Sequence, residues 1–256
     1  MFDIPVESVP TPHGLLITAE NANPGNGLLL YVHGGGFEHR NPPLMNRAGY
    51  LFSKATGRPT LVVHYRLAPA HPYPAPVDDV LDAYRSLTAG TGDSDVRVIA
   101  ESSGAALALT AAQRLRDAGE KLPAGILTWS AVTDLTISGP SVDDSPDDPV
   151  SRELLTHLIG QYLGGTRAEE ASPLHQDLTG LPPLSMVVGG AEALKDDTLR
   201  LAAKVEDAEV DVYEGLAHVF QTAIFEDGNP LGGHLLDRIA KWGRTPKSAT
   251  PSGVDQ

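Results

Sequence analysis

Ser102 stands in a stretch whose residue types and spacing fit a serine nucleophile. It is the centre of AESSG, which follows an apolar run and precedes an Ala- and Leu-rich helical pattern. A serine at a sharp turn from strand to helix needs small neighbours two positions away, because larger side chains collide with its strained backbone. Gly104 fits this G-x-S-x-G pattern, and Ala100 replaces its first glycine. The segment alone leaves a second interpretation open, in which Ser102 only caps the helix.

Three successive glycines, Gly34, Gly35 and Gly36, follow His33 after another apolar run. Such a run costs conformational entropy, which indicates that backbone amides approach a ligand closely there. A carbonyl attacked by serine gains negative charge, and each preorganised amide facing that charge contributes about 2.7–4 kcal/mol. An HGGG loop is associated with lipases and esterases. A phosphate loop fits poorly, because its Lys-Ser/Thr and the G-x-G-x-x-G spacing are both missing. We expect His33 to order the loop.

His218 is the candidate general base. It lies in GLAHVF, just beyond the last expected strand, where a Ser–acid–His order along the chain places the base. An isolated histidine is more often structural, so this position is what favours a catalytic role. None of the other eight histidines has the same context.

The loop after the apolar run 184–188 supplies the candidate acids. A carboxylate there would hold the imidazole in one tautomer and stabilise the imidazolium. Glu192 is our first choice. Asp196 and Asp197 are alternatives, although acids at these positions also suit the cap of the following helix. A Ser–His pair without an acid is the third hypothesis.

Alternating strand and helix patterns predict the elements that position these residues. Short apolar runs ending in turn signals predict buried parallel strands, and three amphipathic runs between them predict helices. The expected strands are 28–32, 60–65, 96–100, 125–129, 184–188 and 209–213, and the expected helices are 78–87, 103–117 and 196–206. This order predicts an α/β fold with a mostly parallel central sheet and helices on both faces. Residues 6–20 resemble an antiparallel edge pair, with Gly14 near the turn.

The chain is expected to form one domain over 1–256, without repeats. Residues 138–165 form an acidic, Pro-rich loop followed by one amphipathic helix. A long excursion of this kind is often functional, so we predict a lid or cap; a solvated linker is the alternative. The last residues, 245–256, are predicted to be a flexible tail.

Composition excludes several classes of function. The formal net charge of −14 argues against binding nucleic acid or an anionic membrane surface. The chain has no cysteine, which excludes disulfides, thiolate catalysis and cysteine-ligated metals. The first residues show no signal-peptide pattern, and no apolar run approaches the roughly 20 residues of a spanning helix. We therefore expect a cytoplasmic protein.

Taken together, the motifs make the sequence similar to the bacterial hormone-sensitive-lipase-like carboxylesterases of the α/β-hydrolase fold. The matching stretches are HGGGF (33–37), YRLAP (65–69), PAPVDD (74–79), the Ser102 turn, DLT (134–136), SPL (172–174), LPPL (181–184) and GLAHVF (215–220). The resemblance implies that Ser102 is the nucleophile, that His218 is the base, and that the amides of Gly35, Gly36 and Ser103 form an oxyanion hole. It implies hydrolysis of small carboxylic esters of short to medium acyl length, without cofactor or metal. A homodimer is left open.

The sequence departs from the family pattern in three places. The usual G-D-S-A-G reads AESSG here, and Ala191 stands where the family carries its catalytic Asp. Glu192 is adjacent, and its additional methylene is expected to let it reach His218. Because the HGGG loop begins at residue 33, the N-terminal cap helices are expected to be largely missing. We therefore predict a reduced cap and a specialised or bulky substrate.

The leading hypothesis is hydrolysis of an ester or lactone through an acyl-enzyme. A lyase or cyclase that reuses the oxyanion hole and the histidine is an alternative, favoured by the altered acid and the reduced cap. A catalytically silent small-molecule binding protein is a third, against which the intact Ser102 and His218 argue.

Overall fold

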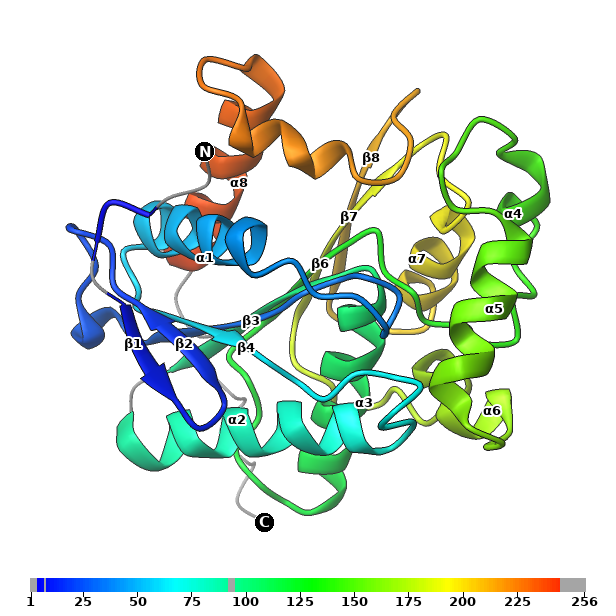
Figure 1. Ribbon diagram of the computed structural model, residues 1–256, viewed down its shortest axis with the longest axis horizontal. Coiled ribbons are helices and arrows are strands. Elements are labelled where there is room, and N and C mark those ends of the chain that lie inside the picture. Colours follow the sequence, from blue (N-terminus) through cyan, green and yellow to red (C-terminus); the bar gives the residue numbers. More distant parts are fainter. Residues whose placement is uncertain (1–3, 7, 92–94, 245–256) are drawn as a thin grey trace, which may run out of the picture.

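An eight-stranded sheet forms the middle layer of the structure, a computed structural model that describes residues 4–6, 8–91 and 95–244 (Figure 1). The strands are β1 (Ser8–Thr11), β2 (Gly14–Ile17), β3 (Leu28–Val32), β4 (Thr60–Val63), β5 (Val96–Glu101), β6 (Ile126–Trp129), β7 (Leu184–Gly189) and β8 (Ala208–Tyr213). They lie in the order β1-β2-β4-β3-β5-β6-β7-β8. From β4 to β8 all neighbours are parallel. The expected α/β architecture is therefore confirmed, while the predicted tail 245–256 lies outside the described residues.

The antiparallel edge predicted for residues 6–20 is also present. β1 pairs with β2, and β2 pairs antiparallel with β4. Gly14 opens β2 with a φ of +142°, and a Cβ there would lie 2.0 Å from the carbonyl oxygen of Val62. Only glycine allows this close approach of the two backbones.

The sheet is covered on both faces, because successive side chains of each strand point in opposite directions. In β3, Leu30 and Val32 pack into the core beneath α2 (Ala75–Thr91), α3 (Ser103–Asp117) and α7 (Lys195–Ala202). Leu29 and Tyr31 pack into the opposite core with α1 (Pro42–Thr56) and α8 (Pro230–Arg244). These two cores explain why the central strands are apolar along their whole length.

The helices differ from the expected ones in three ways. Helices α1 and α8 were not expected, and α7 ends at Ala202, so the prediction of helix through residue 206 is wrong. Helix α2 is longer than expected at both ends, whereas α3 has its predicted bounds. None of the described helices combines the length and the apolar character needed to cross a membrane.

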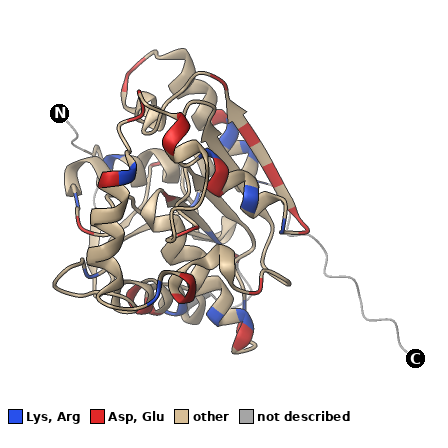
Figure 2. Ribbon diagram, turned by 90° about the vertical axis from the view of Figure 1, so that its right-hand side faces the viewer, with Lys and Arg blue, Asp and Glu red and all other residues tan. Residues whose placement is uncertain are grey.

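The segment 138–165 lies beyond the carboxyl ends of the strands, on the right-hand side of the molecule in Figure 1. It contains the short α4 (Ser141–Asp144) and the amphipathic α5 (Arg152–Leu163), and α6 (Ala168–Ala171) follows it. The hydroxyl of Ser151 caps α5 by accepting from the amide of Leu154 at 3.2 Å. Acidic residues are spread over many elements, including β8 with Glu209 and Asp211, and Lys and Arg are interspersed among them (Figure 2).

Candidate active site

Ser102 sits at the turn between β5 and α3 in a conformation that L-residues rarely adopt, with φ 50° and ψ −120°. Three backbone hydrogen bonds hold it there: its amide donates to Trp129 O at 2.8 Å, and its carbonyl accepts from the amides of Val132 at 3.1 Å and of Ala105 at 3.0 Å. Its side chain makes no capping hydrogen bond to α3. Ser102 thus occupies the N-cap position of α3 without using its side chain, and the hydroxyl stays available on the cavity side of the turn.

Small residues around Ser102 make this turn sterically allowed. A Cβ on Gly104 would lie 2.4 Å from Val32 O and 2.5 Å from His33 O, both backbone atoms. Ala100, the substitute for the first glycine of the motif, is fully buried in β5 without a larger side chain to place. The local sequence therefore fits β5 and α3 tightly against the end of β3.

The glycine loop after β3 lies directly beside Ser102. Gly35 has a φ of +110° and Gly36 a φ of +61°, and a Cβ on Gly35 would lie 2.3 Å from His39 O. Among the described residues, no partner accepts a hydrogen bond from the amides of Gly35, Gly36 or Ser103. The Ser103 hydroxyl accepts from the amide of Phe37 at 3.2 Å, which ties the loop to α3. Amides left free beside a serine can stabilise an oxyanion.

His33 holds the loop and takes no part in titration near neutral pH. Its ring stacks on Tyr65 with centroids 4.2 Å apart, and its Nδ1 donates to Gly34 O at 2.6 Å. Burial lowers the pKa of His33 to about 3, so the ring stays neutral. This arrangement agrees with the expectation that His33 orders the glycine loop.

His218 and Glu192 form a buried pair. The Nδ1 of His218 lies 3.0 Å from Oε2 of Glu192, whose side chain is completely buried. The other carboxylate oxygen accepts from the hydroxyl of Ser130 and from the amide of Gly189, each at 2.7 Å. A carboxylate held by three donors keeps the proton on Nδ1 and leaves Nε2 as the acceptor. A Cβ on Gly189 would lie 2.1 Å from the carbonyl oxygen of Leu216 and 2.9 Å from Oε1 of Glu192, so glycine is needed beside this carboxylate.

The alternative acids are engaged elsewhere. Oδ2 of Asp197 accepts from the amides of Thr133 and Asp134 at 2.6 and 2.9 Å. Oδ2 of Asp196 accepts from the amide of Ser141 at 2.7 Å. Neither carboxylate contacts His218, so the geometry favours Glu192.

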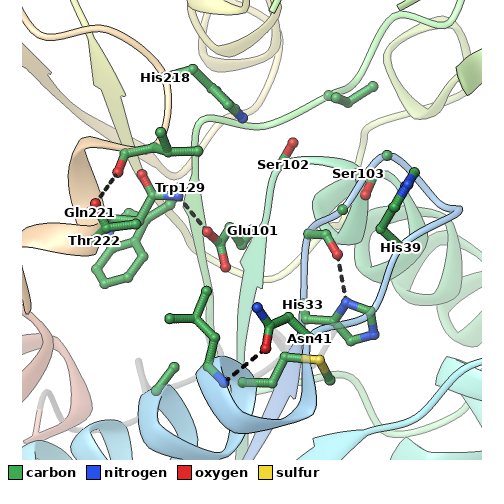
Figure 3. Close-up of a pocket in the computed structure, with 18 of the residues that line it drawn as sticks. His33, His39, Asn41, Glu101, Ser102, Ser103, Trp129, His218, Gln221 and Thr222 are labelled. Carbon is green, nitrogen blue, oxygen red and sulfur yellow. Dashed lines mark hydrogen bonds between the residues drawn. The ribbon is translucent and has the colours of Figure 1, made fainter. Parts of the chain in front are cut away.

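Ser102 and His218 line one cavity of about 740 Å³, and their side chains converge on the same space (Figure 3). Among the described residues no direct hydrogen bond joins the two. Catalytic hydrogen bonds are often long before substrate binds and shorten in the complex. The amides of the glycine loop border the same space, so a carbonyl bound there would meet all three groups.

The walls of the cavity have different chemistry. The wall formed by the 138–165 segment is apolar, with Val150, Leu154, Leu155, Leu158 and Ile159. Residues of α1 and residues after His218 also line the cavity. Between these groups lies a polar cluster that includes Tyr31 of β3 and Glu101 of β5. In this cluster the Glu101 carboxylate accepts from the hydroxyl of Tyr31 at 2.7 Å and from the side-chain Nε2 of Gln221.

Sequence reasoning missed several residues that support the site. Ser130 holds Glu192, Asp148 accepts from the amide of His218 at 2.7 Å, and Gln221 and Tyr31 hold Glu101. Each of these contacts joins residues distant in sequence, and none has a local spacing pattern. Asp148 offered the only signal, as an acid in the segment predicted to cover the site.

Comparison with known proteins agrees with the observed fold. The family model for the alpha/beta hydrolase fold matches residues 29–222. An acetyl-hydrolase of Streptomyces hygroscopicus is 39% identical over 178 residues, covering 68% of this chain and 60% of the relative. An esterase of Acinetobacter venetianus is 35% identical over 231 residues, covering 84% of this chain and 74% of the relative. The chain thus spans less than two thirds of the length of the acetyl-hydrolase and more than two thirds of the length of the esterase.

Solved structures give the same result. An esterase from the bacterial hormone-sensitive lipase family superposes with a TM-score of 0.84 at 35% identity, covering 90% of this chain and 80% of the other. The esterase EstE5, in crystals soaked with p-nitrophenyl butyrate, superposes with a TM-score of 0.86 at 30% identity, covering 95% and 85%.

Proposed function

The chain belongs to the α/β-hydrolase fold family, among its esterases related to hormone-sensitive lipase, and we propose that Ser102, His218 and Glu192 are its catalytic triad. The single observation that carries this assignment is the buried contact between His218 and Glu192 at 3.0 Å, beside the cavity that also holds Ser102. Glu192 reaches the imidazole from the loop after β7.

The reaction proceeds through an acyl-enzyme. Nε2 of His218 takes the proton of Ser102 while Oγ attacks the carbonyl carbon, and the amides of Gly35, Gly36 and Ser103 stabilise the oxyanion. The imidazolium then protonates the leaving alkoxide, and the alcohol departs. Water, deprotonated by His218, attacks the acyl-enzyme; collapse returns the proton to Ser102 and releases the carboxylic acid.

The apolar wall of the cavity indicates which part of a substrate the protein recognises. We assign residues 138–165 as a cover of the site, because Val150, Leu154 and Leu158 present only hydrocarbon to the cavity. Such a wall favours the acyl or alkyl chain of a small ester over a charged group.

We also propose that the protein forms a homodimer and takes a small-molecule substrate. The end of the sheet at β8, where Val212 is 37% exposed, supports a homodimer as a pairing of two sheet edges. The net charge of −14, with acidic residues dispersed along the chain (Figure 2), supports a small-molecule substrate over nucleic acid. We propose the cytoplasm as its location.

The test is a panel of p-nitrophenyl esters of graded acyl length, assayed with the unchanged protein and with Ser102→Ala. We expect hydrolysis by the former and a loss of roughly 10⁴–10⁶ in kcat by the latter. A fluorophosphonate should label Ser102 at a rate that follows esterase activity. Unchanged hydrolysis by Ser102→Ala would refute the mechanism. Rapid labelling without turnover of any ester would favour a lyase or cyclase, and neither labelling nor turnover would favour a silent binding protein.

A further inference from the structure

The backbone that carries His218 is strained and needs support from outside the loop. The following residue, Val219, has a φ of +68°. For a β-branched residue the left-handed region is a genuine outlier, and holding it strains the backbone. Val219 is also 45% exposed, so its own side chain provides little packing to offset this strain. The position of the imidazole therefore depends on contacts from elsewhere.

One of these contacts comes from the cover segment. Oδ2 of Asp148, between α4 and α5, accepts the backbone amide of His218 at 2.7 Å, and the two residues are 70 positions apart. The Asp148 side chain is nearly buried, with the residue 9% exposed. No Lys or Arg in the described part of the chain forms an ion pair with it. The carboxylate is therefore committed to backbone amides, and hydrogen bonds of that kind are short and strong.

The second oxygen of the same carboxylate holds the cavity wall. Oδ1 of Asp148 accepts from the amide of Val150 at 2.8 Å, and the side chain of Val150 lines the cavity. One side chain thus joins the backbone of the general base to a residue that a substrate would contact. Glu192 fixes the ring of His218 through Nδ1, whereas Asp148 fixes its backbone. Two carboxylates from different segments therefore define where the imidazole lies.

We propose that Asp148 is a positioning residue for the general base, so that the cover segment sets the rate of the chemical steps as well as closing the cavity. This inference rests on the proposed function, since it assumes that His218 moves the proton. A base displaced by about 1 Å can slow a reaction about 100-fold without altering how tightly substrate binds. Loss of Asp148 should therefore lower kcat and leave KM nearly unchanged.

The experiment compares Asp148→Ala with Asp147→Ala, because Asp147 is the exposed neighbour in the same segment and carries the same charge. Steady-state kinetics on p-nitrophenyl butyrate are measured well below the melting temperature of each variant. We expect Asp148→Ala to lose about 10- to 100-fold in kcat with KM within about threefold. Its maximal rate of labelling by a fluorophosphonate should fall in parallel, since acylation of Ser102 needs the same base. Asp147→Ala should stay within about twofold of the unchanged protein.

Asp148→Asn gives a second measurement if Asp148→Ala does not fold. Its single amide oxygen can accept from only one of the two amides, so an intermediate loss in kcat of about 3- to 30-fold is expected. The inference is overturned if kcat of the folded variant stays within threefold, or if the loss appears in KM alone. An unchanged protein that neither hydrolyses esters nor reacts with the fluorophosphonate overturns the proposed function instead. The two failures are therefore distinguishable.

Discussion

The loops that carry Ser102 and His218 face one cavity but are built in different ways. Ser102 is placed by the backbone: β5 and α3 are consecutive, and its amide and carbonyl bond to the neighbouring backbone of Trp129 and Val132. His218 is placed by side chains from two distant segments, Glu192 after β7 and Asp148 in the cover.

Because of this difference, we expect changes in the support of Ser102 to alter stability and changes in the support of His218 to alter the reaction rate. A change at the Ser102 turn displaces β5 or α3, which belong to the core of the sheet, so we expect it to affect folding. A change at a holder of His218 removes a hydrogen bond at the rim of the sheet, so we expect it to affect the reaction while the fold persists. Substitutions of the residues that support Ser102 and of those that support His218 should therefore produce opposite patterns in unfolding and in kinetic measurements.

Among the residues that support the two loops, Glu192 on the His218 side should show the largest effect when it is replaced by Gln. The amide can keep its oxygen toward Ser130 and Gly189, but its NH₂ group then faces Nδ1 of His218. The imidazole must then take the other tautomer, which cannot accept the Ser102 proton. We expect kcat on p-nitrophenyl esters to fall by about 10²–10⁴.

The control for this variant is Asp196→Asn, which keeps an oxygen to accept from the amide of Ser141 and should stay within about threefold of the unchanged protein. A loss below about threefold in Glu192→Gln would remove Glu192 from the mechanism. A large loss in Asp196→Asn alone would restore the rejected acid.

Gly104→Ala tests the Ser102 side, with an intermediate effect on stability. The added methyl group would meet two backbone carbonyls at 2.4 and 2.5 Å, so strand and helix must separate. We expect the free energy of unfolding to fall by about 1–3 kcal/mol in a urea titration. Gly160→Ala is the matched control, because nothing lies within 4 Å of its Cβ and it is exposed in α5. There alanine should raise stability by about 0.5–1 kcal/mol. Equal stability of the two variants would contradict a turn built by backbone packing.

The same contrast explains what could be predicted from the sequence. β3 and the Ser102 turn have strong local patterns, five consecutive apolar residues and small residues at fixed spacing, and both were located correctly. Helices α1 and α8 were missed because packing requires glycine inside them, and glycine weakens a helical pattern. A Cβ on Gly49 would lie 2.4 Å from Val62 Cγ2, and one on Gly232 would lie 2.2 Å from Ala223 O.

The supports of His218 could be predicted only in part. The contact of Glu192 with His218 could be anticipated because chain order confines the acid to one short loop, although spacing alone could not separate Glu192 from Asp197. Asp148 and Ser130 lie 70 and 62 positions from the residues they hold. Such contacts depend on how the strands are arranged in the sheet, and no pattern along the chain records them.

A pH titration of stability should show the smallest effect, and it tests Asp197, the buried carboxyl that does not contact His218. Burial raises the pKa of Asp197 from its ordinary 3.8 to about 7, and the hydrogen bonds from the amides of Thr133 and Asp134 only partly offset this. The unfolded chain releases this proton near pH 4, whereas the folded chain keeps it up to about pH 7. The folded state therefore binds more protons in that window, so this carboxyl lowers stability as pH rises from about 4 to 7, and its effect is constant above.

Asp197→Asn should remove this contribution, because an asparagine oxygen can accept from the same two amides without titrating. We expect the variant to gain on the unchanged protein by of the order of 1–3 kcal/mol between pH 5.5 and 8.5 in urea titrations. Its kcat should change less than that of Glu192→Gln, since Asp197 contacts the loop after β6 and not the imidazole. A difference between the two proteins that does not vary with pH would mean that Asp197 has the same charge in the folded and unfolded chains.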